Sequence, residues 1–357
     1  MKSYKHKILV QNSITYGIVI FFFVIAQLMV STGNISSLLK GILVPLCTYV
    51  ILAVSLNLTV GILGELSLGH AGFMCVGAFA GAFFTHAMES VIPNVQIRFI
   101  IALFIGAAVA AVCGILIGIP VLRLKGDYLA IVTLAFGEII KNVINVMYVG
   151  IDKSGLHVSV KDVASLKMAP EGQIIIKGAQ GITGTPKAAT FTIGIILVLI
   201  TLFIVLNMIN SRTGRAIMAI RDNRIAAESI GINVTKYKLL AFSVSAALAG
   251  AAGVLYAHNL ATLAATPKSF GYNMSIMILV FVVLGGIGNI RGSIIAAVIL
   301  TLLPEMLRGL NNYRMLIYAI VLIVMMLLTS SPKAIEIRGR IMESFKKKKK
   351  QTAEEEI

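Results

Sequence analysis

The sequence has few charged residues for its length. Asp, Glu, Lys and Arg make up only 13% of its 357 residues, while 58% are hydrophobic and the mean hydropathy is +0.93. This balance excludes a soluble protein, because a soluble fold needs a polar surface. Apolar runs of about 17–25 residues are typical of transmembrane helices, and short loops separate about ten such runs here. The sequence therefore predicts an all-α integral membrane protein, a polytopic bundle of about ten transmembrane helices.

Residue patterns for metal binding and catalysis are also missing. The three cysteines, Cys47, Cys75 and Cys113, fall within apolar stretches without ligand-like spacing, which is typical of small buried packing residues. The five histidines form no H-E-x-x-H pattern, and no G-x-x-x-x-G-K-S/T phosphate-binding loop occurs. About ten helices leave no room for a soluble catalytic domain. We therefore expect no enzyme activity, metal or cofactor in this chain. If ATP drives the protein, the ATPase is a separate subunit.

The net charge of +16 is explained by where the basic residues lie along the chain, and it does not indicate nucleic-acid binding. Lys and Arg are concentrated in loops that the positive-inside rule assigns to the cytoplasm. Five lysines at 346–350 lie next to a predicted span, where they would meet anionic lipid. At the other end, Lys2, Lys5 and Lys7 precede an apolar run without a following cleavage site, which predicts an uncleaved first helix.

Ten spans are predicted, and an even number places both termini on the same side of the membrane. They cover residues 14–30, 38–58, 66–88, 99–119, 128–149, 189–209, 239–257, 273–286, 293–306 and 314–328. Most Lys and Arg residues fall on the side of the termini, so both termini are predicted to be cytoplasmic. The predicted regions are a cytoplasmic N-terminus (1–13), a membrane domain (14–330) with an external loop (150–187) and a cytoplasmic loop (211–238), and a basic cytoplasmic tail (331–357).

Glycine is concentrated in two short polar segments, GILGELSLGH at 61–70 and GGIGNIRG at 285–292. Irregular backbone survives at membrane depth only where protein or a water-filled cavity satisfies its polar groups. Paired Gly-interrupted segments predict broken helices, an inverted repeat and a substrate path, with spans two to five and seven to ten as the halves. The alternative is two tight cytoplasmic hairpins. The candidate path residues are Gly64, Gly69, His70, Glu138, Gly285, Gly286 and Gly288.

Four polar residues in or beside these spans are candidates for a role of their own. Glu138 and Lys141 are three residues apart on one helix, so they can pair, and charges at membrane depth indicate function by default. The alternatives are a structural pair or a contact between subunits. We expect His70 to bond backbone carbonyls near Gly69, to gate the path or to be structural, and Asp127 to cap the fifth span.

The cytoplasmic loop at 211–238 predicts a docking helix. Ile217, Ile220 and Ile225 are spaced to share one face of an amphipathic helix, which Gly231 would end. Its basic residues are mixed with acids, which favours a partner protein over lipid. A plain interfacial loop is the alternative. A polytopic protein with one structured cytoplasmic loop indicates transport, with the loop as the place where a motor attaches.

This loop resembles the coupling region of ABC importer permeases. Their pattern, E-A-A followed by three residues and G, is present at 225–231 as I-A-A-E-S-I-G, with Ile225 in place of the leading Glu. The stretches at 55–79, 122–141, 178–186, 214–257 and 283–299 are similar to the branched-chain amino acid ABC transporter permeases, the LivM-type subunit in particular. The resemblance covers about residues 43–307. Residues 151–176 depart from that family's short external loop.

The resemblance implies a subunit in a bacterial cell membrane that moves leucine, isoleucine or valine into the cell. The implied partners are a second permease subunit, two cytoplasmic ABC ATPases that hydrolyse ATP, an external solute-binding protein and membrane lipid. Urea, short amides or other amino acids are alternative cargoes. An ion-coupled secondary transporter is a further alternative, for which only Glu138 is a strong candidate, and nothing indicates an intramembrane enzyme. The residues implied in ATPase coupling are Arg221, Asp222, Ala226, Ala227, Glu228 and Gly231.

Overall fold

The computed structural model describes residues 2–32, 37–124, 126–152, 155–169, 172–307, 309 and 313–330. The predicted basic tail at 331–357 lies outside them. Each predicted span coincides with a helix, so the prediction of an all-α polytopic bundle is confirmed. The long helices are α1 (Lys2–Ser31), α2 (Ser37–Asn57), α3 (His70–Ala87), α4 (Val95–Val121), α5 (Asp127–Val146), α6 (Phe191–Asn210), α9 (Val234–Ala257), α11 (Tyr272–Gly285), α12 (Ile290–Met306) and α13 (Arg314–Ser330). Within the described residues, seven stretches are long and apolar enough to cross a membrane.

The external loop contains strands that the sequence analysis did not predict. Strands β1 (Tyr148–Asp152), β2 (Gly155–Ser159) and β3 (Gln173–Lys177) form an antiparallel sheet in the order β2-β1-β3. Two short strands, β4 (Ile182–Thr183) and β5 (Thr262–Leu263), pair between this loop and the segment after α9. The single-turn helices η2 (Ala164–Leu166) and η3 (Gly178–Gln180) lie in the same loop.

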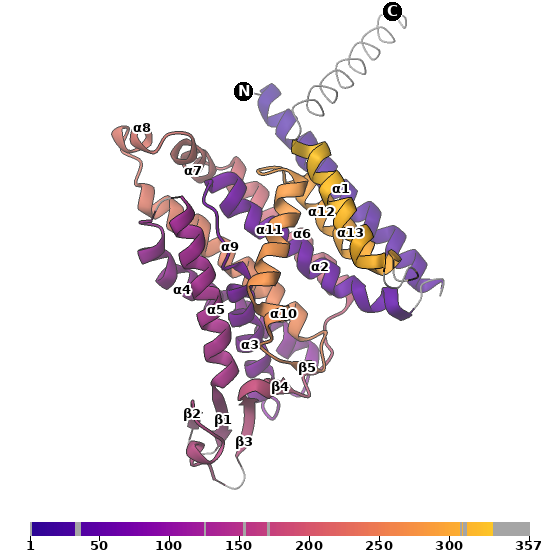
Figure 1. Cartoon of the computed structure of the whole chain (residues 1–357), viewed down its shortest axis with the longest axis vertical. Coiled ribbons are helices and arrows are strands. Elements are labelled where there is room, and N and C mark those ends of the chain that lie inside the picture. Colours follow the sequence, from indigo (N-terminus) through magenta and orange to yellow (C-terminus); the bar gives the residue numbers. More distant parts are fainter. Residues whose placement is uncertain are drawn as a thin grey trace, which may run out of the picture.

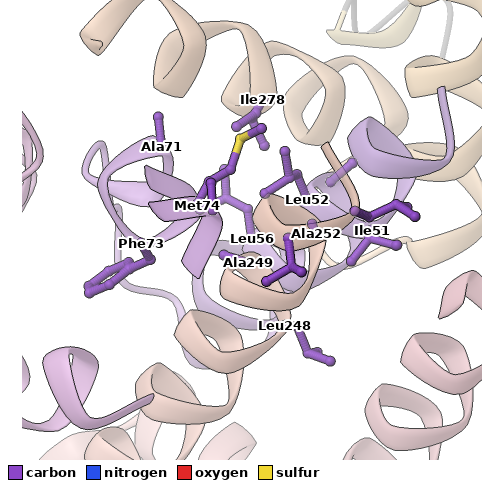
Figure 2. Packing of buried hydrophobic residues seen from close by; sticks show 14 of the residues in the cluster. Ile51, Leu52, Leu56, Ala71, Phe73, Met74, Leu248, Ala249, Ala252 and Ile278 are labelled. Carbon is purple, nitrogen blue, oxygen red and sulfur yellow. The ribbon is translucent and has the colours of Figure 1, made fainter. Parts of the chain in front are cut away.

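The core of the bundle lies where α2, α3, α9 and α11 meet. Leu52, Met74, Ala252 and Ile278 are fully buried there, one from each of these helices, and Figure 2 shows their side chains packed together. The apolar stretch of α2 is 89% buried, whereas that of α4 is only 22% buried. An apolar surface exposed to this extent is stable in lipid or against another apolar surface, but not in water.

A close helix crossing, between α3 and α9, depends on glycine. A Cβ on Gly77 would overlap the backbone of Gly250, and a Cβ on Gly253 would overlap the carbonyl of Met74. Small residues allow this approach, which supplies the van der Waals contact that drives helix association in lipid. The crossing holds α3 rigidly against the core.

The two loops of interest lie at opposite ends of the bundle. Figure 1 shows the short helices α7 (Arg212–Asp222) and α8 (Arg224–Ser229) at one end and strands β1 to β3 at the other. That these two ends face opposite sides of the membrane stays a prediction.

Both halves of the bundle contain an interrupted helix, but the two glycine segments are not equivalent. After α2 and the π-helical turn η1 (Leu58–Leu63), an irregular segment at 64–69 leads into α3. After α9, the corresponding irregular segment is 258–271, which contains β5 and the short helix α10 (Pro267–Phe270) and leads into α11. The glycines at 285–288 instead form a tight turn between α11 and α12, as the hairpin alternative predicts.

Candidate functional site

The loop between α6 and α9 folds into two short helices rather than one. Asn223 has an extended backbone (φ −154°, ψ 105°), and its side-chain oxygen accepts a hydrogen bond from the Ala226 amide at 3.0 Å. This Asn cap ends α7 and starts α8 in a new direction. Ile217 and Ile220 are buried, whereas Ile225 is 80% exposed. The prediction that these three isoleucines share one face is therefore wrong, because the chain turns between Ile220 and Ile225.

Helix α8 is anchored by one small residue and exposes most of the others. Ala227 is only 2% exposed and packs against Ile220 and Val234. Ile225 and Ile230 are 80% and 75% exposed, which leaves two large apolar side chains on an otherwise polar loop. Such side chains are typical of an interaction surface. The loop surface therefore has the chemistry of a protein docking site.

The residues at the end of α8 follow the sequence prediction. Gly231 has φ +84°, and the Ile232 amide donates to the Ala227 carbonyl at 3.0 Å. A positive φ favours glycine, so Gly231 ends α8 as predicted. Ala226 and Glu228 are exposed, and Glu228 pairs with Arg224 at 3.0 Å.

Arg221 connects this loop to the interrupted helix. Its Nη1 donates to the Gly61 carbonyl in η1 at 3.0 Å, and its Nε and Nη2 bond Asp222 at 3.1 and 3.0 Å. The aliphatic part of Arg221 lies directly over Gly64, where φ is +79° and a Cβ would overlap Arg221 Cγ. Any side chain at Gly64 would therefore separate α7 from the interrupted helix.

A second connection is made by an ion pair. Lys238, near the start of α9, donates from Nζ to Oε1 of Glu65. The Lys238 and Glu65 side chains are only 8% and 15% exposed, so the pair is largely shielded from screening by salt. The segment at 64–69 is thus held at one end by both α7 and α9.

The same segment runs back into the bundle and places His70 in its interior. His70 Nε2 lies 2.8 Å from the Ser55 hydroxyl of α2, and the Ser245 hydroxyl donates to the Ser55 carbonyl at 2.6 Å. Ser55 is eight residues before Leu63, which is about 12 Å along a helix. Helix α3 therefore begins inside the bundle. This bond fits the alternative in which His70 is a structural histidine, buried and bonded to a neighbouring helix.

Asn57 connects the two glycine segments. Its Oδ1 accepts from the Gly288 amide at 2.9 Å and its Nδ2 donates to the Ser293 hydroxyl at 2.8 Å. A Cβ on Gly61 would overlap both Asn57 and Gly288, so the segments touch through backbone. Gly286 and Gly288 have φ of +92° and +80°, and Gly285 packs on the start of α12.

The N-terminal turns of α3 and α11 meet near Glu138. The Ala71 amide donates to the Ser275 hydroxyl at 3.1 Å, and the Tyr272 amide donates to Glu138 Oε1 at 2.7 Å. Helix N-termini carry unpaired amides and partial positive charge. Glu138 Oε2 accepts from Lys141 Nζ at 2.5 Å. The predicted pair is confirmed, and it also connects α5 to α11.

Two other residues singled out in the sequence, Gly69 and Asp127, lie at the starts of α3 and α5. Gly69 fits against the Thr133 carbonyl of α5, where a Cβ would overlap, and the Leu68 amide donates to the Thr133 hydroxyl at 3.0 Å. Asp127 does not cap α5. The capping position is Gly126, which has φ +59° and makes no side-chain bond. A left-handed turn at Gly126 moves the start of α5 to Asp127.

The sequence analysis missed the polar residues that hold this region together. Ser55, Asn57, Ser245 and Ser275 are all buried, and each bonds a residue from another helix or segment. The available signal was a polar side chain inside an apolar span, where an unpaired group is costly. Across the described ranges, no three His, Cys, Asp or Glu side chains gather as a metal site.

Comparisons with known proteins agree with this architecture. The family described as "Branched-chain amino acid transport system / permease component" matches residues 38–328. The high-affinity branched-chain amino acid transport system permease protein LivM of Salmonella typhimurium is 34% identical over 288 residues, which cover 78% of this chain and 66% of the relative. LivM of Escherichia coli has the same identity and coverage. LivH of Salmonella typhimurium is 26% identical over 258 residues, which cover 71% of this chain and 79% of the relative.

The family match covers most of the chain and includes all the contacts described above. The chain is thus a multi-pass membrane protein, and it belongs to the family of branched-chain amino acid transport permease components. The matched region spans 66% of the length of the LivM relatives. No solved structure matches the chain.

Proposed function

We propose that this chain is a membrane-spanning permease subunit of an ATP-driven ABC importer that carries leucine, isoleucine and valine into the cell. Family membership supports the permease role. The names of the LivM and LivH relatives support the branched-chain cargo. In this proposal the chain has no ATPase activity of its own and binds no cofactor. It works with a second permease subunit, two cytoplasmic ABC ATPases and an external solute-binding protein.

The observation that carries the proposal is the contact between Arg221 and the Gly61 carbonyl. It places the exposed loop formed by α7 and α8 directly against the interrupted helix. In the proposed mechanism the ATPases dock on α8 through Ile225, Ile230 and the small residue Ala226, with Glu228 as a polar anchor. Motion of the loop then reaches the segment at 64–69 through Arg221 and through the ion pair between Lys238 and Glu65.

The interrupted helix continues this connection to the middle of the bundle. The segment at 64–69 ends at His70, and the first turn of α3 bonds the first turn of α11 through Ser275. The first turn of α11 also bonds Glu138. Glu138 lies about 16 Å along α5 from Asp127. A movement at α7 would thus reposition two helix N-termini near mid-membrane, where the carboxylate of an amino acid would be favoured. In this proposal both termini and the loop at 211–238 lie in the cytoplasm, as the positive-inside rule predicts.

The proposal is tested by uptake of labelled leucine, isoleucine, valine and urea in cells that lack this gene. Cells that carry the wild-type gene should regain uptake of the three amino acids. The Ala226→Arg variant should insert and fold but fail to restore uptake, because a long charged side chain on α8 blocks docking. Lys161→Arg, a conservative change in the external loop, is the control.

Each outcome decides a different part of the proposal. Loss and recovery of urea uptake alone would move the cargo to short amides. Full uptake by a stably expressed Ala226→Arg variant would contradict the docking role of α8. Uptake that collapses with the ion gradient but persists without ATP would favour the ion-coupled alternative.

A further inference from the structure

A narrow groove of about 410 Å³ runs along one side of the bundle, between α1, α2, α6 and α12. Figure 1 shows α1 and α12 at the same edge of the bundle. All the described residues that line the groove are apolar. Among them, Phe22 of α1 and Ile295 of α12 are 54% and 42% exposed, so the groove is open on its outer side.

The apolar lining excludes polar occupants. The proposed amino-acid cargo would bury its ammonium and carboxylate groups there without partners, which is costly. Water is excluded for the same reason, because a buried water needs about two to four polar partners. The groove lies within four of the predicted spans, where the surroundings are hydrocarbon. Its occupant is therefore apolar.

The dimensions of the groove fit one hydrocarbon chain. On α12 its lining runs from Ile294 to Met306, which is about 18 Å along a helix. This length is close to half of the hydrocarbon core of a membrane, which is about 30 Å thick. A volume of about 410 Å³ over that length gives a mean width of about 5 Å, whereas a helix with its side chains is about 10–12 Å wide. The groove is thus as long as one lipid leaflet and too narrow for a helix of another protein.

A positive charge lies one helical turn from the groove. Arg291 Nε, at the start of α12, donates to the Thr15 hydroxyl of α1 at 2.7 Å. Arg291 is three residues before Ile294, which lines the groove. Thr15 is likewise three residues before Ile18, which lines the groove from α1. Residues three apart on a helix are neighbours, so the contact between Arg291 and Thr15 lies at one end of the groove.

This end of the groove favours an anion. The four helices, all within the described residues, contain one acidic residue, Glu305, and it is about 21 Å from Arg291 along α12. Guanidinium groups bind phosphate oxygens strongly, and the N-terminus of α12 adds partial positive charge. The positive-inside rule assigns this end to the cytoplasmic leaflet, where anionic lipids attract basic residues.

We infer that the groove binds an anionic phospholipid of the cytoplasmic leaflet, with one acyl chain between α1 and α12 and its phosphate at Arg291. A lipid in this position fills the space beside α1, whose apolar stretch is only 11% buried within the protein. The inference does not depend on the transported cargo, so its outcome is separate from that of the proposed function.

The test is native mass spectrometry of the full chain released from nanodiscs that contain equal amounts of phosphatidylglycerol and phosphatidylcholine with the same acyl chains. The wild type should retain phosphatidylglycerol about fivefold more than phosphatidylcholine, because Arg291 attracts the anionic headgroup. Arg291→Gln should remove this preference, and Arg291→Lys, which keeps the charge, should retain most of it. Arg215→Gln is the control, because Arg215 is an exposed arginine of α7 that does not line the groove.

A second pair of variants tests the acyl-chain site. Ala26 of α1 lines the groove, so the ring in Ala26→Phe should displace part of the acyl chain. Retention of phosphatidylglycerol should fall about tenfold, because the lost burial of two methylene groups is already enough for that change. Ala108→Phe is the control, because Ala108 is exposed on α4 and does not line the groove.

The possible results separate the two parts of the site. Equal retention of the two lipids by the wild type, or an unchanged preference in Arg291→Gln, would overturn the phosphate contact. Unchanged retention by Ala26→Phe would overturn the acyl-chain site. Retention of no lipid by the wild type would overturn both and indicate that a protein segment covers the groove. Arg291 and Ala26 lie on different helices, so one variant stays informative if the other fails to fold.

Discussion

Replacing Arg221 by Gln should loosen α7 from the interrupted helix. Arg221→Gln removes the charged donor that bonds the Gly61 carbonyl at 3.0 Å. Hydrogen bonds to charged groups contribute about 1.5–3 kcal/mol when buried. The Arg221 side chain is 38% exposed, so screening by solvent reduces the expected loss to about 1 kcal/mol. That difference corresponds to about a fivefold rise in the population in which η1 is open.

Hydrogen exchange measures this opening directly. Backbone amides of residues 58–69 in the full chain, held in nanodiscs, should exchange about fivefold faster in Arg221→Gln than in the wild type. Arg215→Gln is the matched control, because Arg215 is an exposed arginine on the same helix with only a 3.4 Å contact to Asn210. Equal exchange in all three proteins would refute the assignment of Arg221 as the connection between the loop and η1.

Three further substitutions test other contacts by thermal or denaturant unfolding. Asn57→Leu should destabilise the fold by about 2 kcal/mol, because it leaves the Gly288 amide without its acceptor and removes the bond from Asn57 to the Ser293 hydroxyl. An unchanged unfolding midpoint would contradict the role of Asn57 in joining the two glycine segments. Gly77→Val should lower the free energy of unfolding by about 3 kcal/mol, because the new side chain overlaps the backbone of Gly250. Gly17→Val is the control, because a Cβ at Gly17 meets no other atom. Glu138→Gln should destabilise the fold by about 3 kcal/mol, because the buried Lys141, which is 8% exposed, loses the carboxylate that it pairs with. The double variant with Lys141→Met should recover most of that stability. No recovery would argue against a direct pair.

Hydropathy alone predicted the number and order of the long helices, because lipid imposes a simple length and composition rule. Some local chemistry was also predictable, although the cap predicted at Asp127 was not found. The end of α8 at Gly231 and the pairing of Glu138 with Lys141 depend only on residues a few positions apart. These features are fixed before any tertiary contact forms.

The contacts that define the site could not be predicted in this way. Asn57 and Gly288 are 231 positions apart and meet only after α2, α11 and α12 have packed. The sheet of the external loop was missed because its strands are only five residues long and are separated by loops. Ile225 was misplaced because the helical period continues in the sequence, whereas the Asn223 cap interrupts it in space.

Reconstitution provides the most direct test of the central claim, which is that this chain carries amino acids when ATPases act on its α7–α8 loop. The purified assembly that contains this chain would be placed in proteoliposomes with labelled leucine, with and without ATP. The account predicts accumulation of leucine that requires ATP and that is lost in Ala226→Arg while the assembly remains folded. Accumulation without ATP, or unchanged ATP-driven accumulation by Ala226→Arg, would contradict it.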